Sequence, residues 1–421
     1  MTDLDRCLTR VADKIGTPAF VYLADDIDTR LDELRARLGP WFVFSYAMKC
    51  NPNPGLLAWL APRVDLIDVS SIGEFRAAVA AGWSPERASF TGPGKREAEI
   101  AEALAGGIGE LVLENLREAR IASRIAQEAG RTQDVLIRLA PARVPKGFGD
   151  QMAGRPSAFG FDVELADTEL PQLLALPYLR VVGLHIYSGT QCLKPEAICE
   201  NYRIFLQIFR DVCSAHDLTP LKLVFGSGLG IPYHPGDTPL DLAAVAGGIG
   251  DDLSAFRAEP RFAATRLILE LGRYLVGEAG YFLTRVINVK TSRGNRIGIC
   301  DGGMNTHLPA SGHFGMVIHR NYRMHRVGGG RVPEKIDLVG PLCTSIDRLA
   351  SAVMLPVIAE GDLVAVHSSG AYGPTASPLH FISHPLPHEV LIIGDTLHDV
   401  SQGFADRRPR HDAVDNPRTV E

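Results

Sequence analysis

The chain has 421 residues, of which 46% are hydrophobic and 22% are charged, and its formal net charge is −6. These values are typical of a soluble globular protein with about two or three domains. The negative charge gives no general attraction for nucleic acid or for an anionic membrane, so we expect neither as a partner. Residues 1–20 carry acids and bases throughout, which argues against a signal peptide, and no apolar run approaches the length of a membrane span.

The seven cysteines are scattered along the chain and form no C-x-x-C pair. This spacing argues against a disulfide framework and against a zinc knuckle. It favours a reducing compartment, and we predict a cytoplasmic protein.

From residue 25 to residue 275, strand-like runs alternate with helical segments. The strands are predicted at Trp41–Tyr46, Val64–Val69, Ala88–Thr91, Glu110–Leu113, Asp134–Leu139, Val181–Tyr187, Lys222–Phe225 and Arg266–Leu269. The helices between them include Asp26–Leu38, Gly73–Ala81, Arg96–Leu104, Leu116–Ala129, Cys192–Ala215 and Leu240–Phe256. Such alternation predicts a (β/α)8 barrel of the α/β class. The alternative, an open doubly wound sheet, would have a G-x-G-x-x-G turn after its first strand, and the chain has none there.

The pattern changes after residue 275. Strands separated by Gly- and Pro-rich turns are predicted at Tyr281–Val289, Arg296–Asp301, Lys335–Val339, Asp362–His367 and Glu389–Ile393. We therefore assign residues 276–421 to a mostly antiparallel β domain. The early strand Pro18–Ala24 lies outside the barrel repeat, so residues 1–24 are assigned to the same domain. The charged segment 405–421 is predicted to be a loose tail.

The chemically distinctive residues lie at the ends of the barrel strands, where the active sites of such barrels are found. Lys49 follows the first strand, and a lysine at the end of a buried strand is a candidate for a Schiff base with a carbonyl cofactor. The alternative is a lysine whose amine only reaches solvent. Further candidates on the other strands are Asp68, Arg138, His185, Glu270 and Arg273.

A Gly-rich loop, Phe225-Gly-Ser-Gly-Leu-Gly230, follows the seventh strand, and Arg273 follows the eighth. Backbone amides and a cation after strands seven and eight are typical of a phosphate site, although such a loop can also be a simple turn. A Schiff-base lysine, a phosphate cradle and a carboxylate together indicate pyridoxal 5′-phosphate. Glu270 would pair with its ring nitrogen, and His185 would lie on its ring unless it is an ordinary core histidine.

In order and spacing, these motifs resemble those of the fold-type III pyridoxal-phosphate decarboxylases, which include ornithine, arginine and diaminopimelate decarboxylases. The matching segments are Tyr46-Ala-Met-Lys49-Cys-Asn51, Asp68 with Ser71 and Glu74, His185-Ile-Tyr-Ser-Gly189, Gly226-Ser-Gly228-Leu-Gly230 and Glu270-Leu-Gly-Arg273. Ser227 and Leu271 replace the family's usual Gly and Pro. The resemblance implies an alanine-racemase-like barrel with a C-terminal β domain. The cofactor-binding residues that it implies are Lys49, Asp68, Arg138, His185, Gly228, Leu229, Gly230, Glu270, Gly272, Arg273 and Tyr372.

Two segments of the β domain also resemble family motifs. Gly340-Pro-Leu-Cys343 is similar to the motif whose cysteine enters the partner subunit's active site and protonates the substrate carbon after CO2 leaves. Gly370-Ala-Tyr372-Gly373 is similar to the segment whose tyrosine contacts the cofactor. Taken alone, Cys343 would be a small buried hydrophobe and Tyr372 a turn residue. The resemblance implies a homodimer with shared active sites.

The residue after Cys343 bears on the substrate. In relatives that form diamines it is an acid, which meets the distal ammonium group of the substrate, whereas here it is Thr344. This difference argues against ornithine, lysine and diaminopimelate. Asp347, four positions after the cysteine, is the other candidate for such an acid.

Longer stretches resemble the branch that decarboxylates an aminoacyl group on a carrier protein, as in the glutamyl decarboxylase of butirosin synthesis. These stretches are Ser89–Lys95, Ala158–Asp162, Gly183–Gln191, Asp301–Met304 and Gly340–Thr344. Residues 319–331 contain four arginines and no acid, which would suit an acidic carrier or would simply form a solvated loop.

We therefore predict a decarboxylase in which Lys49 forms the Schiff base, Glu270 stabilises the carbanion and Cys343 reprotonates it. Its substrate would be an amino acid or a carrier-bound aminoacyl group. Three alternatives remain: a decarboxylase of a free diamino acid, a racemase, against which Glu270 argues, and an inactive regulatory homologue, against which the retained site residues argue. His380, His384 and His388 are spaced by four, but prolines break the helix that would hold a metal, so no metal site is predicted.

Overall fold

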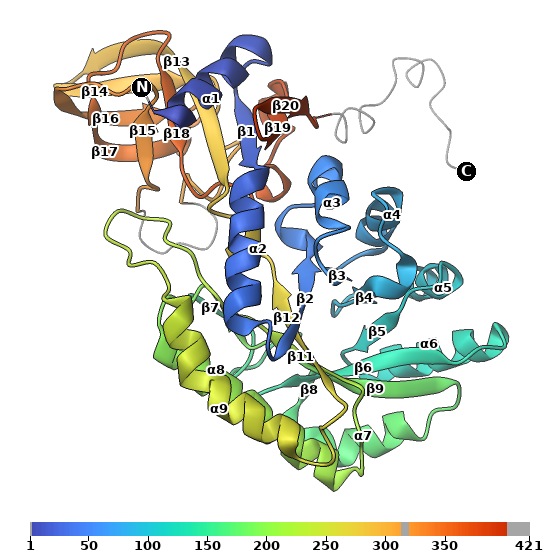
Figure 1. The fold of residues 1–421 in the computed structure, drawn as a ribbon. Coiled ribbons are helices and arrows are strands. Elements are labelled where there is room, and N and C mark those ends of the chain that lie inside the picture. The colour runs from blue at the N-terminus through green and yellow to red at the C-terminus, as the bar shows by residue number, and fades with distance from the viewer. Residues whose placement is uncertain (1, 313–319, 402–421) are drawn as a thin grey trace, which may run out of the picture. The chain divides into compact units, whose positions relative to one another are not determined.

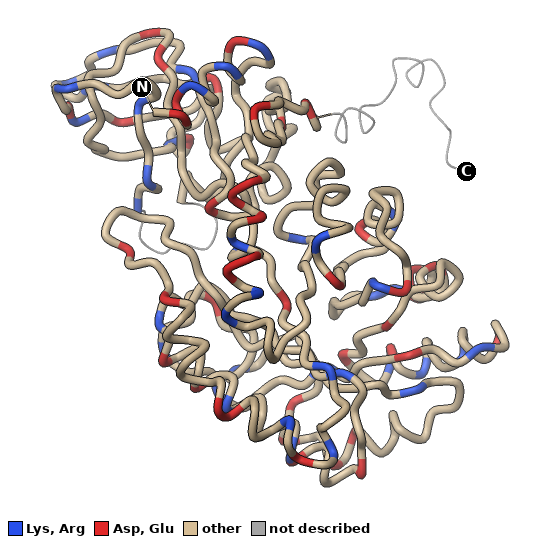
Figure 2. The backbone as a smooth tube through the Cα atoms, viewed as in Figure 1, with Lys and Arg blue, Asp and Glu red and all other residues tan. Residues whose placement is uncertain are grey.

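The computed structural model describes residues 2–312 and 320–401. These residues form two compact units, coloured along the chain in Figure 1. One unit contains residues 26–52 and 57–278, and the other contains residues 2–25, 53–56, 279–312 and 320–401. The predicted tail at 405–421 lies outside the described residues. Basic and acidic residues are interspersed in both units (Figure 2).

The first unit, within the described residues, is a closed barrel of eight parallel strands. In chain order they are β2 (Phe42–Ala47), β3 (Leu66–Val69), β4 (Ala88–Phe90), β5 (Glu110–Leu113), β6 (Gln133–Ala140), β9 (Leu179–Ile186), β11 (Lys222–Gly226) and β12 (Arg266–Leu271). Neighbouring strands follow the order β5-β4-β3-β2-β12-β11-β9-β6, and pairing of β5 with β6 closes the barrel. The predicted fold class is thereby confirmed.

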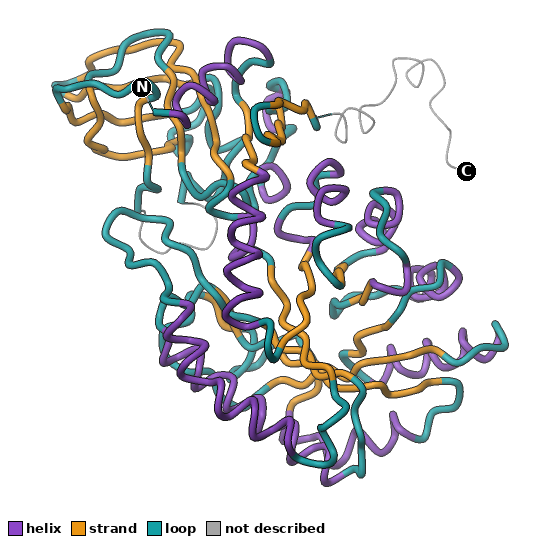
Figure 3. Tube along the Cα trace, viewed as in Figure 1, coloured by secondary structure: helices purple, strands orange, loops and turns teal. Residues whose placement is uncertain are grey.

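Helices follow the strands on the outside of this barrel, as Figure 3 shows in purple. They are α2 (Ala24–Leu38), α3 (Pro54–Leu60), α4 (Ile72–Ala80), α5 (Glu97–Ala105), α6 (Leu116–Glu128), α7 (Ala166–Leu174), α8 (Pro195–Ala215), α9 (Leu242–Ala258) and α10 (Arg273–Val276). Side-chain caps set two of the starts: Ser71 Oγ accepts from the amide of Glu74, and Asn115 Oδ1 accepts from the amide of Glu118. Because these caps follow β3 and β5 within two residues, the loops at those strand ends are short and tightly held.

Alternation along the strands places polar side chains above an apolar layer. The apolar layer is a buried cluster of Val112, Leu136, Val182, Val224 and Ile268, against which Leu66 packs. Side chains two positions apart share one face of a strand. On β3, β6 and β12, and directly after β5, the next residue on that face toward the carboxyl end is charged: Asp68, Arg138, Glu270 and Glu114. The period of two therefore gathers these polar side chains at one end of the barrel.

Two further short ribbons lie beside the barrel strands. β8 (Phe161–Asp162) pairs with the end of β6, and β7 (Asp150–Gln151) pairs with β10 (Gly189–Thr190). β7 and β8 lie in the long connection between β6 and β9, and β10 follows β9. These pairings anchor the connection at the carboxyl end of the barrel strands.

The second unit is built on one large sheet. Its strands are β1 (Ala19–Leu23), β13 (Gly280–Ser292), β14 (Asn295–Cys300), β15 (Met324–Arg326), β16 (Pro333–Val339), β17 (Arg348–Pro356), β18 (Leu363–Val366), β19 (His388–Ile393) and β20 (Thr396–Asp399). The main path is β17-β16-β14-β13-β1-β19-β20, and β18 pairs with both β13 and β15. Within the described residues all pairings are antiparallel except β1 with β19 and β14 with β16.

Helix α1 (Asp3–Lys14) covers part of this sheet. Its apolar face, which includes Leu8 and Val11, packs against Val21, Leu283 and Val390 in one buried cluster. The helix begins with a capping box, in which Thr2 and Asp5 exchange side-chain and backbone hydrogen bonds.

Several elements are not among those predicted from the sequence, namely α1, α3, α7, α10, β7, β8, β10, β15, β17 and β20. Local features explain two of them: α7 contains Pro171, which weakens a helical pattern, and β17 is interrupted by a register shift near Ala352, whose φ is +51°. No helix of the described segments has both the length and the apolar character needed to cross a bilayer.

A buried carboxylic acid lies between β1 and β19 in the second unit. The Tyr22 hydroxyl donates to Glu389 Oε1 over 2.7 Å, and burial raises the pKa of Glu389 to about 7 although bonds from Tyr22 and Asn53 lower it. Because this pKa lies above the ordinary 4.5, the folded state holds the proton more tightly than the unfolded state. The stabilising effect of the protonated acid is complete below pH 4.5 and is lost as the pH rises through about 7.

We therefore expect the variant Glu389→Gln to be more stable than the parent at pH 8, by up to about 3 kcal/mol at about 1.4 kcal/mol per pKa unit. The advantage should shrink as the pH is lowered to 5, because the parent acid is then protonated. Urea unfolding at both pH values measures the difference, with Glu360→Gln, at an exposed carboxylate of the same unit, as the control. A difference that does not change with pH would contradict the assignment.

Candidate functional site

The carboxyl end of the barrel brings together side chains from four strand ends. Lys49 lies in the short 3-10 turn η1 (Met48–Cys50) after β2, Asp68 lies on β3, His185 on β9 and Glu270 on β12. The charge of Lys49 lowers the pKa of both Asp68 and Glu270, so its amine lies within electrostatic reach of both carboxyl groups.

Glu270 and His185 form a buried pair. His185 Nε2 lies 3.0 Å from Glu270 Oε1, and both side chains are at least 95% buried. Burial by itself raises the pKa of Glu270, but the charges of His185, Lys49 and Arg138 outweigh it, and the pKa is lowered. Glu270 is thus a carboxylate kept ionised inside the protein. His185 Nδ1 is buried and has no hydrogen-bond partner in the part of the chain that the structure describes.

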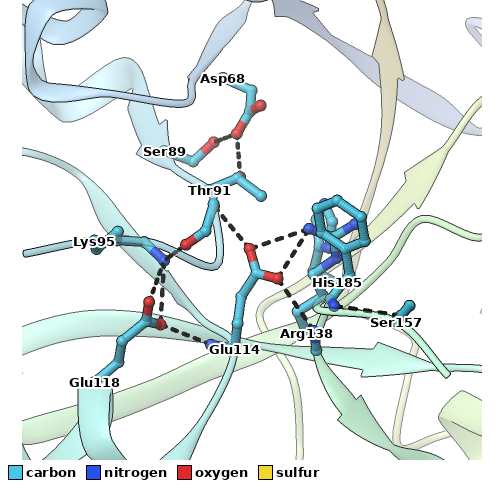
Figure 4. A network of polar contacts seen from close by, with 12 residues as sticks. Asp68, Ser89, Thr91, Lys95, Glu114, Glu118, Arg138, Ser157 and His185 are labelled. Atoms are coloured by element: carbon cyan, nitrogen blue, oxygen red, sulfur yellow. Dashed lines mark hydrogen bonds and ion pairs between the residues drawn. The ribbon is translucent and has the colours of Figure 1, made fainter. Parts of the chain in front are cut away.

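Asp68 is the opposite case. Burial and the nearby charge of Glu270 raise its pKa to about 8, although Lys49 and two hydroxyl groups lower it. Its Oδ1 accepts from the hydroxyls of Ser89 and Thr91, which leaves Oδ2 to carry a proton (Figure 4). The two carboxyl groups of the site therefore differ in charge at neutral pH, one protonated and one ionised.

Lys49 is half-buried beside an aromatic ring. Its Nζ lies 5.2 Å from the centroid of the Tyr187 ring, a distance at which the ring face attracts an ammonium group. The neighbouring Cys50 is fully buried, and burial raises the pKa of its thiol to about 12, so this cysteine is not a nucleophile.

Arg138 enters the site from β6 and is held there by Glu114, which follows β5. Its Nη1 lies 3.0 and 3.1 Å from the two carboxylate oxygens of Glu114, and both side chains are buried. A second buried pair, Lys95 with Glu118, lies beside the first (Figure 4).

The Gly-rich loop after β11 lies next to Arg273. Gly228 has a φ of +70°, which favours glycine, and an added Cβ would lie 2.6 Å from the ring of Phe148. The amide of Ser227 donates to the carbonyl of Glu270, and Cys192 exchanges backbone hydrogen bonds with Gly228 and Gly230. Arg273, at the start of α10, donates to the Tyr233 hydroxyl over 3.0 Å, just beyond the loop. The amides of Ser227 and Gly230 are thus bonded within the protein, and the loop amides of Gly228 and Leu229, with the cation of Arg273 next to Gly272, are the groups that would suit an anion.

The remaining candidates belong to the second unit. Cys343 is exposed, Thr344 and Tyr372 are half-buried, and Tyr372 has a φ of +55°. Asp347 is buried, and its two oxygens accept from the backbone amides of Met304 (2.7 Å) and Leu342 (2.8 Å). These bonds connect the segment around Met304 with the segment around Leu342, so the role of Asp347 is structural.

Of the arginines in the basic segment, Arg326 forms an ion pair with Asp362 inside the second unit, whereas Arg320, Arg323 and Arg331 are exposed. His319 lies outside the described residues.

Sequence reasoning did not identify Glu114, Glu118, Tyr187 or Tyr233. One local signal was available for the first two: an acid directly after a predicted strand, followed by an Asn cap and a second acid at the third helical position. The two tyrosines had no comparable signal, because their partners lie 138 and 40 residues away in the sequence.

Comparisons with known proteins add an independent result. Residues 24–277 match the family model described as the pyridoxal-binding domain of pyridoxal-dependent decarboxylases. Over 392 residues, the chain is 33% identical to L-glutamyl-[BtrI acyl-carrier protein] decarboxylase of Niallia circulans, covering 91% of this chain and 90% of the relative. It is 30% identical over 394 residues to diaminopimelate decarboxylase of Aquifex aeolicus, covering 91% and 89%. Among solved structures, diaminopimelate decarboxylase of Helicobacter pylori complexed with L-lysine superposes with a TM-score of 0.82 at 26% identity, covering 93% and 95%.

Proposed function

Because this chain belongs to the pyridoxal-dependent decarboxylases, we propose that its substrate is an aminoacyl group held on a carrier protein. The enzyme is a carboxy-lyase, and its cofactor is pyridoxal 5′-phosphate.

The residues at the carboxyl end of the barrel fit this cofactor. An ionised buried carboxylate (Glu270) suits a protonated ring nitrogen, and the Gly-rich loop with Arg273 suits a phosphate group. His185 presents a buried ring nitrogen without a hydrogen-bond partner among the described residues. When bound, the cofactor withdraws electrons from the α-carbon of the substrate, which allows CO2 to leave.

The residues of this chain supply the remaining functions. Lys49 Nζ would hold the cofactor and supply the amine that the substrate amine replaces. Glu270 would provide the negative charge for the ring nitrogen, and the charges of His185, Lys49 and Arg138 favour its ionised form. Cys343 Sγ, exposed on its own chain, would deliver a proton to the substrate carbon in the active site of a second copy. We accordingly propose a cytoplasmic homodimer with shared sites, to which Tyr372 would also contribute.

One observation carries the choice of substrate: the chain offers no suitable acid for a distal ammonium group in the Cys343 segment. Thr344 cannot ionise, and both oxygens of Asp347 are occupied by backbone amides. An ammonium group brought there would stay without a charged partner, which strongly disfavours a diamino acid. The activity named for the 33% identical relative, together with the exposed Arg320, Arg323 and Arg331, which would suit an acidic carrier, supports the same choice.

The test is CO2 release by the cofactor-loaded enzyme from a panel of substrates. The panel contains free ornithine, lysine, arginine, diaminopimelate and glutamate, and glutamyl and other aminoacyl groups on a carrier protein. We expect kcat/KM to be at least about 100-fold higher for a carrier-bound group than for free ornithine, lysine or diaminopimelate, since an unpaired buried charge costs about 3 kcal/mol or more.

The rates with free glutamate and with glutamate on the carrier are compared directly. Both substrates undergo the same bond cleavage, so a difference in rate measures the contribution of the carrier. Efficient turnover of free diaminopimelate or ornithine would contradict the proposed substrate and leave the decarboxylase assignment intact. Failure of every substrate would instead direct attention to acyl groups outside the panel.

A further inference from the structure

The carboxylate of Glu114 joins three separate segments at the mouth of the barrel. Oε1 accepts from the amide of Gly92 (2.7 Å) in the loop after β4, and Oε2 accepts from the amide of Gly160 (3.1 Å) before β8. Both oxygens also accept hydrogen bonds from Nη1 of Arg138 on β6. Glu114 is 97% buried, so these protein groups replace its hydration.

The charges in this region cancel in two separate pairs. Behind Glu114, Lys95 Nζ lies 3.1 and 3.2 Å from the oxygens of Glu118 and 2.6 Å from the carbonyl of Gly92. Burial lowers the pKa of Lys95 and raises that of Glu118, while each charge opposes the shift of the other. The backbone amide of Glu114 donates to Glu118, but the carboxylate of Glu118 makes no bond to Arg138 in the described structure. Glu114 is thus the residue that neutralises Arg138.

Arg138 is held on a second side by an aromatic ring. The centre of its guanidinium group lies 4.7 Å from the centroid of the Phe159 ring. Phe159 directly precedes Gly160, whose amide is bound by Glu114, and a Cβ on Gly160 would lie 2.9 Å from the Arg138 carbonyl. Glu114 therefore binds the guanidinium group of Arg138 directly (Figure 4) and also binds the amide next to Phe159, the residue whose ring contacts that group.

The charge of Arg138 reaches the reacting centre. Together with His185 and Lys49, it favours the ionised form of Glu270. A shift of the guanidinium group would change the field at Glu270 without any change in Glu270 itself.

We propose that Glu114 is a positioning residue for the decarboxylase: it acts through Arg138, which it holds beside the cofactor site. The inference rests on the proposed cofactor-binding role of Arg138. It does not depend on which acyl group is decarboxylated.

A double-mutant cycle tests this proposal through the affinity of the apo-protein for pyridoxal 5′-phosphate, measured without substrate. The variants are Glu114→Gln, Arg138→Leu and the double variant. Glutamine places an amide donor opposite the N–H groups that the carboxylate now accepts, so Glu114→Gln should raise the dissociation constant at least about tenfold. Because Glu114 acts through Arg138, the double variant should bind no more weakly than Arg138→Leu alone.

Thermal unfolding of the same four proteins gives a second readout. Arg138→Leu leaves a buried carboxylate without its cation and should lower the melting temperature, and adding Glu114→Gln should restore part of that loss. Glu118→Gln is the matched control: the same substitution, four residues along, on a carboxylate that binds Lys95. It should lower stability but change the dissociation constant of the cofactor by less than about twofold.

Three results would overturn the proposal: an unchanged cofactor affinity in Arg138→Leu, effects of the two substitutions that multiply in the double variant, or equal loss of affinity in Glu118→Gln. If Glu114→Gln does not fold, the cycle is run with Glu114→Asp. This variant keeps the negative charge, but its side chain is one methylene shorter and places the carboxylate farther from Arg138. A failed substrate panel would leave this measurement unaffected, because cofactor binding needs no substrate.

Discussion

Replacement of Lys49 by alanine is expected to lower decarboxylation by at least about 1,000-fold, the largest effect of any single substitution in this protein. In the proposed mechanism Lys49 supplies the amine for the cofactor, and its charge acts on both Glu270 and Asp68. Its side chain is half-buried and fills no part of the core, so Lys49→Ala should melt within a few degrees of the parent. CO2 release measures the activity, and borohydride reduction of the loaded enzyme followed by peptide mapping should place the cofactor on Lys49.

Lys290→Ala, at an exposed lysine of β13, is the control and should retain full activity. Mapping of the reduced cofactor to another lysine, or retention of about a tenth of the activity by Lys49→Ala, would mean that Lys49 does not hold the cofactor.

The second large effect is expected at Glu270. In Glu270→Gln the side chain keeps its size and can still accept a hydrogen bond from His185 Nε2, which now lies 3.0 Å from Oε1. What is lost is the negative charge, which the surrounding cations maintain against burial by lowering the pKa of Glu270. We expect kcat to fall by about 100- to 1,000-fold with little change in KM, because this charge is needed where electrons accumulate in the reaction.

The ionised state of Glu270 also predicts the pH dependence of the parent. Because its pKa is lowered, Glu270 stays charged through the mildly acidic range, and activity lost between pH 7 and pH 5 should come from other groups. Steady-state kinetics from pH 7 to pH 5 would separate the loss of the Glu270 charge from the titration of other groups. Glu278→Gln, which loses an ion pair with Arg30, is the control. A variant Glu270→Gln with unchanged kcat and a raised KM would assign the residue to binding alone.

Two carboxyl groups at the carboxyl end of the barrel differ in charge at neutral pH. Asp68 and Glu270 both lie at strand ends and both are buried. Burial and the charge of Glu270 raise the pKa of Asp68, although its two hydroxyl partners lower it, whereas at Glu270 the nearby cations outweigh burial and the pKa falls. Environment, and not residue type, decides which group is ionised.

Much of the fold was predictable from the sequence. The alternation of apolar runs with helical segments placed the eight barrel strands, because each strand and helix has a period that is visible over a few residues. The order of short motifs at the strand ends predicted the decarboxylase family and its cofactor, and the comparisons confirm both. The roles of the individual site residues stay predictions, to be tested by the substitutions above.

Other elements could not be predicted from local pattern. Asp347 was the remaining candidate for a substrate-binding acid, but its oxygens accept from the amides of Met304 and Leu342, one of which lies 43 residues away. Helix α7 tolerates Pro171, and strand β17 tolerates an interruption of its ladder, because the surrounding structure stabilises both.

By itself, then, the sequence determined the barrel, the β domain and the set of strand-end residues, since each depends on a spacing of two to four residues. Only the tertiary structure decided how the buried charges pair. Gly92 and Gly160 lie 22 and 46 residues from Glu114, and Arg138 lies 24 residues away. No local pattern relates these residues, and closure of the barrel brings them to one carboxylate because a buried charge is stable only where several donors meet it.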